Sequence, residues 1–397
     1  MPLTINERIT QIAVSGIRQF SNQLVDYPDA VNLTIGQPDF PTPESVKQAG
    51  IHAITNNLTG YSHNAGLIEL RHAVSRFFNE KYHFSYKAET EIIITIGASE
   101  AIDAVFRTIL EEGDEVILPA PCYTGYAPII TMCGAKVKYL DTSDTGFQPS
   151  PERLKGLITE KTKAVLFNFP SNPTGVTIDH DQMDQLAAVL KEQEIFILSD
   201  EIYSENTFVG EHRSFAGYPE LRDRLFVIHG LSKSHSMTGW RIGFLLGPEA
   251  LMQHCIKIHQ YNSICAPLPS QYAAIEALGN SRHVPAEMNK EYIVRRDYVY
   301  GRLRAMGLDV VKPNGAFYIF PSIKDFGLTS FSFATHLLKS GGVACVPGSA
   351  FSEYGEGYIR ISYAYAMPVL EKGMDRMESF IATLREERTI VPDKKLI

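Results

Sequence analysis

Short apolar runs alternate with amphipathic stretches through the middle of the chain. The first run covers residues 92–96 and is followed by helical periodicity over 99–110. Further runs rich in β-branched residues lie at 115–118, 164–168, 195–199, 225–229 and 242–246, and 181–193 again has helical periodicity. Apolar runs of this kind are typical of parallel strands covered on both faces. The pattern predicts an α/β fold with a mostly parallel, doubly wound sheet.

The pattern changes after about residue 290. A charged helix is expected over 291–306, short strands around Val310 and over 316–320, 343–346 and 358–362, and a last helix over 367–384. This predicts a smaller α+β domain. The first 45 residues are rich in proline and too short for a core of their own, so we expect them to pack on it. The predicted domains are residues 46–289, and residues 1–45 together with 290–397.

Composition and charge exclude several classes of protein. Hydrophobic residues make up 44% of the 397 residues and charged residues 21%, which is enough apolar material for a large core. Thirty-seven Lys and Arg against 45 Asp and Glu give a net charge of −8 without a basic run, which argues against nucleic acid as a partner. No leader pattern and no run of about 18 apolar residues is present, so neither secretion nor a membrane partner is expected.

The cysteines and histidines show no pattern typical of a disulfide or metal site. Five cysteines without a C-x-x-C pair argue against a disulfide framework and a structural zinc site, and favour the reducing cytoplasm. The twelve histidines form no H-E-x-x-H motif, so no metal site is predicted. No G-x-G-x-x-G follows the first predicted strand, which disfavours a nicotinamide dehydrogenase.

Residues 230–243 form the most informative segment, Gly-Leu-Ser-Lys-Ser-His-Ser-Met-Thr-Gly-Trp-Arg-Ile-Gly. Lys233 stands among small hydroxyl residues after a predicted strand, eight residues before Arg241. Taken alone, the segment fits a surface loop with a solvated lysine. It also fits a lysine that forms a Schiff base, with Arg241 and the hydroxyl groups binding a phosphate.

Four further motifs occur in a fixed order around this segment. They are Gly97-Ala98-Ser99, Pro119-Ala120-Pro121-Cys122-Tyr123, Ser171-Asn172-Pro173-Thr174-Gly175 and Ser199-Asp200-Glu201-Ile202-Tyr203. Each alone has an ordinary interpretation, since an Asp after a strand is often a helix cap and Asn-Pro-x-Gly is a turn. In combination the motifs resemble the class I/II aminotransferases, fold-type-I enzymes that use pyridoxal 5′-phosphate. The resemblance covers nearly the entire chain.

The resemblance implies a role for each residue at the cofactor ring. Lys233 would bind the cofactor covalently and act as the catalytic acid and base. Asp200 would face the ring nitrogen and keep it protonated, so that the ring can accept electrons. Tyr203 and Asn172 would contact the ring oxygen, and Tyr123 would stack on the ring. Lys233, Asp200 and Tyr203 are the predicted catalytic residues.

The cofactor phosphate needs a separate site, and the resemblance implies three contributions to it. Backbone N–H groups at a helix N-terminus bind phosphate, a role that falls to Gly97, Ala98 and Ser99. Arg241 would supply positive charge. Relatives often carry a serine three residues before the lysine, where this chain has Gly230, and Ser232 is the candidate for the missing contact.

Substrate binding and assembly follow from the same resemblance. Arg360, in Tyr358-Ile359-Arg360-Ile361-Ser362, would bind the substrate carboxylate with Asn172 beside it, and the Gly36 backbone would cover the substrate. Tyr61 aligns with a tyrosine that reaches the cofactor phosphate of the neighbouring subunit. The resemblance therefore implies a homodimer with shared active sites that acts on amino acids and 2-oxo acids.

The expected reaction moves an amino group from an L-amino acid to 2-oxoglutarate by a ping-pong mechanism. Residues 230–243, 259–262 and 315–321 resemble most the bacterial N-acetyl-L,L-diaminopimelate aminotransferases of lysine biosynthesis. Aromatic or aspartate aminotransferase and a pyridoxal-phosphate-dependent lyase on the same fold stay open as alternatives. A catalytically silent protein would be expected to lose Lys233 or Arg360, and both are present.

Overall fold

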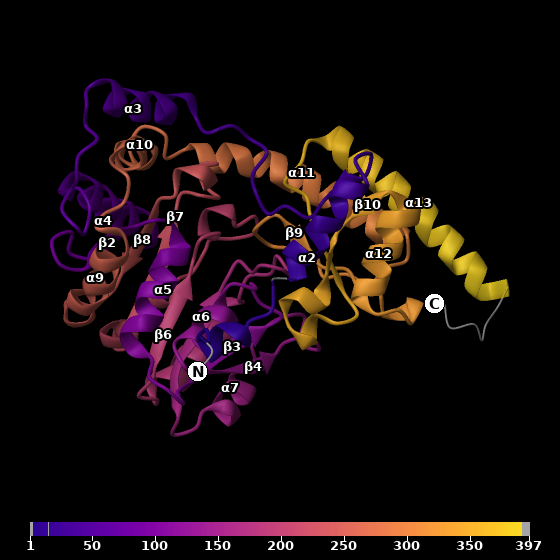
Figure 1. Ribbon diagram of the computed structural model, residues 1–397, viewed down its shortest axis with the longest axis horizontal. Coiled ribbons are helices and arrows are strands. Elements are labelled where there is room, and N and C mark those ends of the chain that lie inside the picture. The colour runs from indigo at the N-terminus through magenta and orange to yellow at the C-terminus, as the bar shows by residue number, and fades with distance from the viewer. Residues whose placement is uncertain (1–2, 15, 391–397) are drawn as a thin grey trace.

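A computed structural model describes residues 3–14 and 16–390 of the chain, and its largest element is a seven-stranded sheet (Figure 1). The strand order is β2-β8-β7-β6-β5-β3-β4. Strand β8 (Gly243–Leu246) is antiparallel to both of its neighbours, and the other pairs are parallel. The remaining strands are β2 (Ile92–Thr95), β3 (Glu115–Ala120), β4 (Lys136–Asp141), β5 (Thr162–Asn168), β6 (Phe196–Asp200) and β7 (Leu225–Gly230). The predicted mostly parallel α/β sheet is confirmed.

Helices cover both faces of this sheet because successive strand residues point to opposite sides. In β2, Ile92 and Ile94 pack in one core and Ile93 packs in the other. The first core contains side chains of α4 (Ile68–Tyr82), α8 (His180–Lys191) and α10 (Leu268–Leu278), on which α3 (Glu44–Thr55) packs. The second contains side chains of α5 (Ala98–Ile109), α6 (Tyr126–Met132) and α9 (Glu249–Ser263).

A second unit lies beside the sheet (Figure 1). Its helices are α11 (Val284–Ala305), α12 (Ser330–Gly341) and α13 (Met367–Ile390). Its strands are β9 (Tyr318–Ile319), β11 (Val346–Pro347) and β12 (Ile359–Ser362), which form an antiparallel sheet, and β10 (Val343–Ala344), which pairs in parallel with β1 (Val31–Asn32). Phe20 from α2 (Gly16–Gln23) and Leu33 enter the core of this unit. N-terminal residues thus complete a core made mostly of C-terminal ones.

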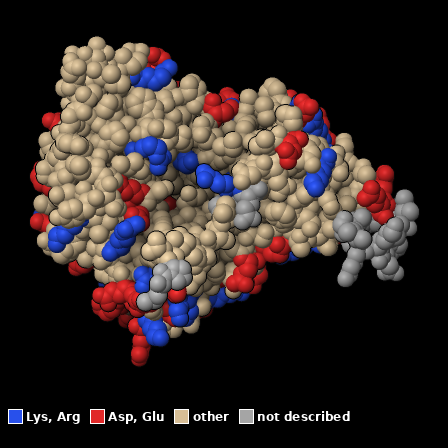
Figure 2. All heavy atoms as spheres, viewed as in Figure 1, with Lys and Arg blue, Asp and Glu red and all other residues tan. Residues whose placement is uncertain are grey.

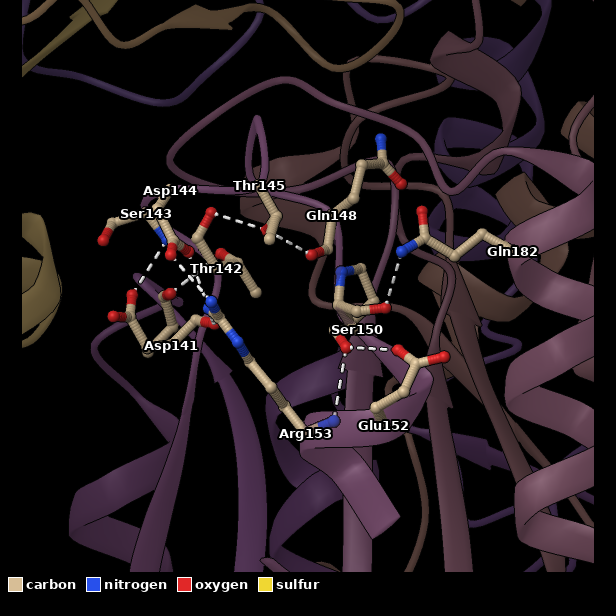
Figure 3. Close-up of polar contacts among 12 residues, drawn as sticks. Asp141, Thr142, Ser143, Asp144, Thr145, Gln148, Ser150, Glu152, Arg153 and Gln182 are labelled. Atoms are coloured by element: carbon tan, nitrogen blue, oxygen red, sulfur yellow. Dashed lines mark hydrogen bonds and ion pairs between the residues drawn. The ribbon is translucent and has the colours of Figure 1, made fainter. Parts of the chain in front are cut away.

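A short loop between β4 and α7 (Pro151–Leu157) contacts the second unit. Figure 3 shows its polar contacts, in which Arg153 donates hydrogen bonds to both carboxylate oxygens of Asp144 at 2.6 and 2.7 Å. Phe147 from the same loop packs against the rings of Phe320 and Tyr358 in the second unit, at centroid distances of 5.7 and 5.4 Å. The hydrogen bonds hold the loop in place, and the packing of Phe147 on the second unit depends on the position of this loop.

The structure corrects the predicted pattern in two places. No strand forms around Val310, because Pro313 and Gly315 follow at once and the backbone turns toward Gly175, whose carbonyl accepts from the Gly315 N–H at 2.9 Å. Val310 is nevertheless buried, as part of the core of the second unit. The edge strand β4 was not predicted, because its alternation of Lys and apolar residues differs from the continuous apolar runs of the other strands.

Two element boundaries also differ from the prediction. The charged helix begins at Val284 rather than near residue 291, with Pro285 in its first turn, where proline lacks only an N–H that would have no helical partner. The last helix, α13, ends at Ile390 rather than at residue 384. A short α1 (Glu7–Thr10), which was not predicted, precedes α2. Among the described residues, no helix is both long enough and apolar enough to span a bilayer.

Candidate active site

A cavity of about 460 Å³ lies where strand ends of the sheet meet the second unit. Figure 2 shows a hollow between the two parts of the molecule, with Lys and Arg side chains at its edge. Asn168 and Asp200 are the last residues of β5 and β6, and Ala98 begins α5, so the cavity lies at the carboxyl ends of parallel strands. The predicted residues that line it are Gly36, Ala98, Ser99, Tyr123, Asn172, Asp200, Tyr203, Ser232, Lys233, Arg241 and Arg360.

Asp200 is a buried carboxyl group held by two hydrogen bonds. Its Oδ2 accepts from the Tyr126 hydroxyl at 2.6 Å, and its Oδ1 accepts from the Ile202 N–H at 3.2 Å. Burial raises the pKa of Asp200 to about 6, although both hydrogen bonds oppose this shift. A buried carboxylate is stabilised by a cation, and a protonated ring nitrogen is one that fits this place.

Lys233 follows β7, and its side chain is partly buried. Its Nζ donates a hydrogen bond to the Gly36 carbonyl at 2.7 Å. Burial, together with the charges of Arg360 and Arg241, lowers the pKa of Lys233 to about 8. Since a neutral amine is the nucleophilic form, this environment favours attack on an aldehyde. Replacement of Gly36 by a residue with a side chain would overlap the Tyr318 hydroxyl, so glycine is required there.

Arg360 on β12 is buried against neutral partners. Its Nη1 donates to Asn172 Oδ1 at 2.8 Å and its Nη2 donates to the Thr34 carbonyl at 2.6 Å. Its Nε has no hydrogen-bond partner among the residues that the structure describes. A buried guanidinium without a carboxylate partner is suited to bind an anion, and a substrate carboxylate is an anion of the right shape.

The first turn of α5 and Arg241 form a second cationic region. Gly97 precedes the helix with a φ of 78°, and a Cβ atom there would lie 2.5 Å from Arg241 Nη2. Arg241 Nη1 donates to the Thr238 carbonyl at 2.9 Å, which fixes the guanidinium beside the helix N-terminus. Free N–H groups and a guanidinium together fit a phosphate.

Gly230 and Ser232 differ in whether they line the cavity. Gly230 ends β7, and a Cβ atom there would lie 3.0 Å from the Ile242 carbonyl oxygen, so a side chain would be tightly packed. Ser232 lines the cavity. The serine hydroxyl therefore enters the site two residues after the position of the glycine.

Several residues of the site were missed by the sequence analysis. Two of them are tyrosines that contact predicted residues. The Tyr318 hydroxyl forms a hydrogen bond of 2.8 Å with the Tyr203 hydroxyl, and the Tyr126 hydroxyl donates to the Asp200 carboxylate. Asn168 links Asp200 to Asn172, since its Nδ2 donates to the Asp200 carbonyl at 3.0 Å and its Oδ1 accepts from the Asn172 N–H at 3.2 Å. Asn168 could have been found, because it ends a predicted strand. The other missed residues that line the cavity are Ile17, Ser21, Thr34, Ile35, Ile102, Ile202 and Thr238.

Tyr61 lies apart from the rest of the predicted site. Its side chain is 82% exposed, and it does not line the cavity of its own chain. Gly97 does not line the cavity either, although it precedes the helix turn that does. Within the described part of the chain, no group of three or more His, Cys, Asp or Glu side chains could hold a metal ion.

The geometry fits pyridoxal 5′-phosphate, and comparison with known proteins agrees. The family model for aminotransferase class I and II matches residues 28–376. The chain is 54% identical over 382 residues to the probable N-acetyl-LL-diaminopimelate aminotransferase of Bacillus subtilis, covering 96% of this chain and 97% of that protein. It is 38% identical to aromatic-amino-acid aminotransferase 2 of Thermococcus litoralis, covering 98% and 100% of the two chains.

A solved structure agrees with the sequence comparisons. The aspartate aminotransferase of Thermus thermophilus with maleate superposes with a TM-score of 0.90 at 33% identity, and the match covers 96% of this chain and all of that one. The fold, the donor set of the cavity and the family match lead to one conclusion: the chain belongs to the class I and II aminotransferases, fold-type-I enzymes that depend on pyridoxal 5′-phosphate.

Proposed function

We propose that this enzyme transfers the amino group of N-acetyl-L,L-diaminopimelate to 2-oxoglutarate by a ping-pong mechanism, as a step of lysine biosynthesis. The observation that carries the proposal is the 54% identity with the probable N-acetyl-LL-diaminopimelate aminotransferase over nearly the full length of both chains. The cavity supports it, since two separate cationic groups, Arg241 and Arg360, suit an anionic cofactor and an anionic substrate.

Proton transfer in this proposal belongs to Lys233. Pyridoxal 5′-phosphate, when bound, supplies an electron sink for the bond that breaks at the substrate Cα. Lys233 is partly buried and has a pKa of about 8, so its amine accepts the α-proton in the neutral form. Asp200 supplies negative charge at the far end of the site, and the Tyr126 hydroxyl and the Ile202 N–H donate the hydrogen bonds that hold its carboxylate in place.

Binding and orientation belong to a second set of residues. Arg360 binds the α-carboxylate, with Asn172 fixing its guanidinium through the 2.8 Å hydrogen bond. Arg241 and the α5 N-terminus bind the cofactor phosphate, with Ser232 beside them. Tyr123 would stack on the cofactor ring, and Tyr203 and Asn172 would contact its ring oxygen. The exposed Tyr61 reaches the phosphate site of a second subunit.

The proposed assembly follows from Tyr61. We propose a cytoplasmic homodimer in which each active site contains a residue of the other subunit. Each subunit has a cofactor-binding domain of residues 46–289 and a substrate-closing domain of residues 1–45 and 290–397. The parallel pairing of β1 with β10 supports assigning the N-terminal residues to the second domain.

Aromatic or aspartate aminotransferase is the second candidate function. It is supported by the 38% identity to aromatic-amino-acid aminotransferase 2 and by the structural match to an aspartate aminotransferase. Tyr123, Tyr126 and Tyr318 line the cavity and would accept an aromatic side chain. A lyase reaction on the same residues would release ammonia and would need no 2-oxo acid.

A panel of amino donors with 2-oxoglutarate tests the assignment. N-acetyl-L,L-diaminopimelate should give the highest kcat/KM, with glutamate formed in equal amount. A higher value for aspartate or phenylalanine would overturn the proposed donor in favour of the second candidate. Release of pyruvate and ammonia without glutamate would indicate a lyase.

Replacement of Lys233 tests the proposed mechanism directly. Lys233→Ala removes the amine that binds the cofactor and moves the proton, so turnover should fall by at least about a thousandfold. After borohydride reduction, which makes the lysine–cofactor bond permanent, the denatured and filtered protein should retain the cofactor in wild type and lose it in Lys233→Ala. Lys257→Ala, at an exposed lysine of α9, is the matched control and should keep both properties. Retained transamination in Lys233→Ala would contradict the mechanism.

A further inference from the structure

Residues 33–42 include Thr34, Ile35 and Gly36, which line the Lys233 cavity, and the segment is fixed at both ends. At the beginning, the Leu33 N–H donates to the Ala344 carbonyl at 2.9 Å, which continues the pairing of β1 with β10. At the end, the Thr42 hydroxyl donates to the Ser236 carbonyl at 2.7 Å. The segment therefore joins the second unit to the loop that carries Lys233.

Two carbonyl groups of this segment contact the central residues of the site. The Gly36 carbonyl accepts from Lys233 Nζ at 2.7 Å, and the Thr34 carbonyl accepts from Arg360 Nη2 at 2.6 Å. A movement of the segment would therefore change the surroundings of the amine and of the carboxylate-binding guanidinium together.

Asp39 ties the middle of the segment to α11. Its Oδ1 accepts a hydrogen bond from Arg295 Nη1 at 2.6 Å. The Arg295 side chain is only 7% exposed, and its guanidinium carbon lies 4.9 Å from the centre of the Phe40 ring and 5.7 Å from that of Tyr292. The guanidinium is thus enclosed by two rings and neutralised by one carboxylate.

No other carboxylate of the described residues forms an ion pair with Arg295. Its Nε and the neighbouring Tyr292 hydroxyl are buried without hydrogen-bond partners in that part of the chain. Loss of the Asp39 charge would leave a buried guanidinium unpaired, which is strongly unfavourable. Arg295 therefore holds Asp39 in one place.

Proline residues make the segment stiff. Pro38, Pro41 and Pro43 each fix one φ angle, so fewer bonds are free to rotate between Asp39 and its neighbours. Asp39 is only three residues from Gly36. The position of the Asp39 carboxylate consequently limits the position of the Gly36 carbonyl.

We propose that Asp39 and Arg295 are a positioning pair that sets the enzyme's affinity for carboxylate substrates. The pair holds the carbonyls of Gly36 and Thr34 against Lys233 and Arg360, and itself touches neither the substrate nor the cofactor. The inference rests on the proposed roles of Lys233 and Arg360 in the reaction.

Asp39→Asn in the holoenzyme tests the pair. The KM for the amino donor and the Kd of maleate, a dicarboxylate probe followed through the cofactor absorbance, should each rise by about tenfold, as expected for one charge-assisted hydrogen bond. The kcat should change by less than about twofold, because the reacting groups stay in place once substrate is bound. Asp144→Asn is the matched control, since Asp144 also pairs with an arginine, Arg153, but lies outside the cavity (Figure 3).

Further variants separate positioning from folding. Arg295→Lys keeps the charge and should bind maleate more tightly than Arg295→Gln does. The double variant Asp39→Asn with Arg295→Gln should bind maleate no more weakly than the weaker-binding single variant does. The reason is that each substitution removes the same Asp39–Arg295 interaction. A maleate Kd in Asp39→Asn equal to that in Asp144→Asn, or additive losses in the double variant, would overturn the inference.

The two proposals can fail separately. Maleate binding requires no turnover, so it reports on Asp39 even if N-acetyl-L,L-diaminopimelate is not the donor. The KM comparison then uses whichever donor the wild-type enzyme accepts. Failure of the donor panel would change the proposed substrate, and failure of the maleate titration would remove the positioning pair.

Discussion

The buried carboxyl group of Asp200 lowers the stability of the folded, cofactor-free protein when it is ionised. Its ordinary pKa of 3.8 is raised to about 6 by burial, so the folded chain binds a proton that the unfolded chain releases between about pH 4 and pH 6. Without cofactor, wild-type stability should therefore fall as pH rises through this window. Asp200→Asn cannot ionise, and we expect it to be more stable than wild type above pH 6 by roughly 2–3 kcal/mol, with activity lost.

Denaturant unfolding of the cofactor-free protein at pH 4 to 8 measures this difference. The asparagine can accept from the Ile202 N–H and donate to the Tyr126 oxygen, so both contacts of Asp200 keep a partner. Tyr126→Phe is the complementary variant, because it removes a hydrogen bond that lowers the Asp200 pKa and should move the window to higher pH. Equal pH profiles for wild type and Asp200→Asn would contradict this account.

The sequence motifs predict about half of the residues that line the cavity, but not the residues that hold them in place. Lys233, Asp200 and Arg360 were identified because they belong to motifs with a chemical purpose. Tyr126 and Tyr318 escaped because an aromatic residue in an apolar context has the same pattern in a core and in a site. Their hydroxyls become functional only through contacts with distant residues.

The N-terminus of α5 is the element on which the proposed phosphate site depends. Gly97→Ala would place a Cβ atom 2.5 Å from Arg241 Nη2 at a φ of 78°. Arg241 must move, so the Kd for pyridoxal 5′-phosphate should rise by at least about tenfold, the loss expected for one charge-assisted contact. A titration followed by absorbance measures it.

Gly113→Ala is the matched control for this substitution. Gly113 has a similar φ of 91°, but a Cβ atom there would meet nothing within 4 Å. Both variants should lose about 1 kcal/mol of stability from the backbone conformation. Only Gly97→Ala should also lose cofactor affinity, and equal affinities in the two variants would show that the contact with Arg241 is not needed.

The elements that the sequence predicts well are those whose conformation depends on their own residues rather than on neighbouring elements. The buried strands of the sheet were found within one or two residues, because continuous apolar runs leave few alternatives. The edge strand β4 and the missing strand near Val310 depended on context instead. Pairing with β3 makes β4 a strand, and the turn that begins at Pro313 prevents one at Val310.

The electrostatics of the whole molecule do not predict its ligands. The net charge is −8, yet the cavity contains Lys233, Arg241 and Arg360. Enclosed charges act over short distances in a poorly polarisable environment, so their arrangement outweighs the average charge of the surface. Lys233 and Arg241 belong to the connection between β7 and β8 and Arg360 belongs to β12, so only the tertiary structure brings the three charges together.

The proposed dimer makes a prediction at the scale of the whole molecule. Tyr61 is 82% exposed and lies outside its own chain's cavity, so any contact with the cofactor must be made in a second copy. Tyr61→Phe removes one hydroxyl, and we expect the Kd for pyridoxal 5′-phosphate to rise by about tenfold while sedimentation still shows a dimer. Tyr300→Phe, on α11 and outside the cavity, should leave the Kd unchanged. An active monomer, or a dimer in which Tyr61→Phe binds the cofactor as tightly as Tyr300→Phe, would rule out a shared site.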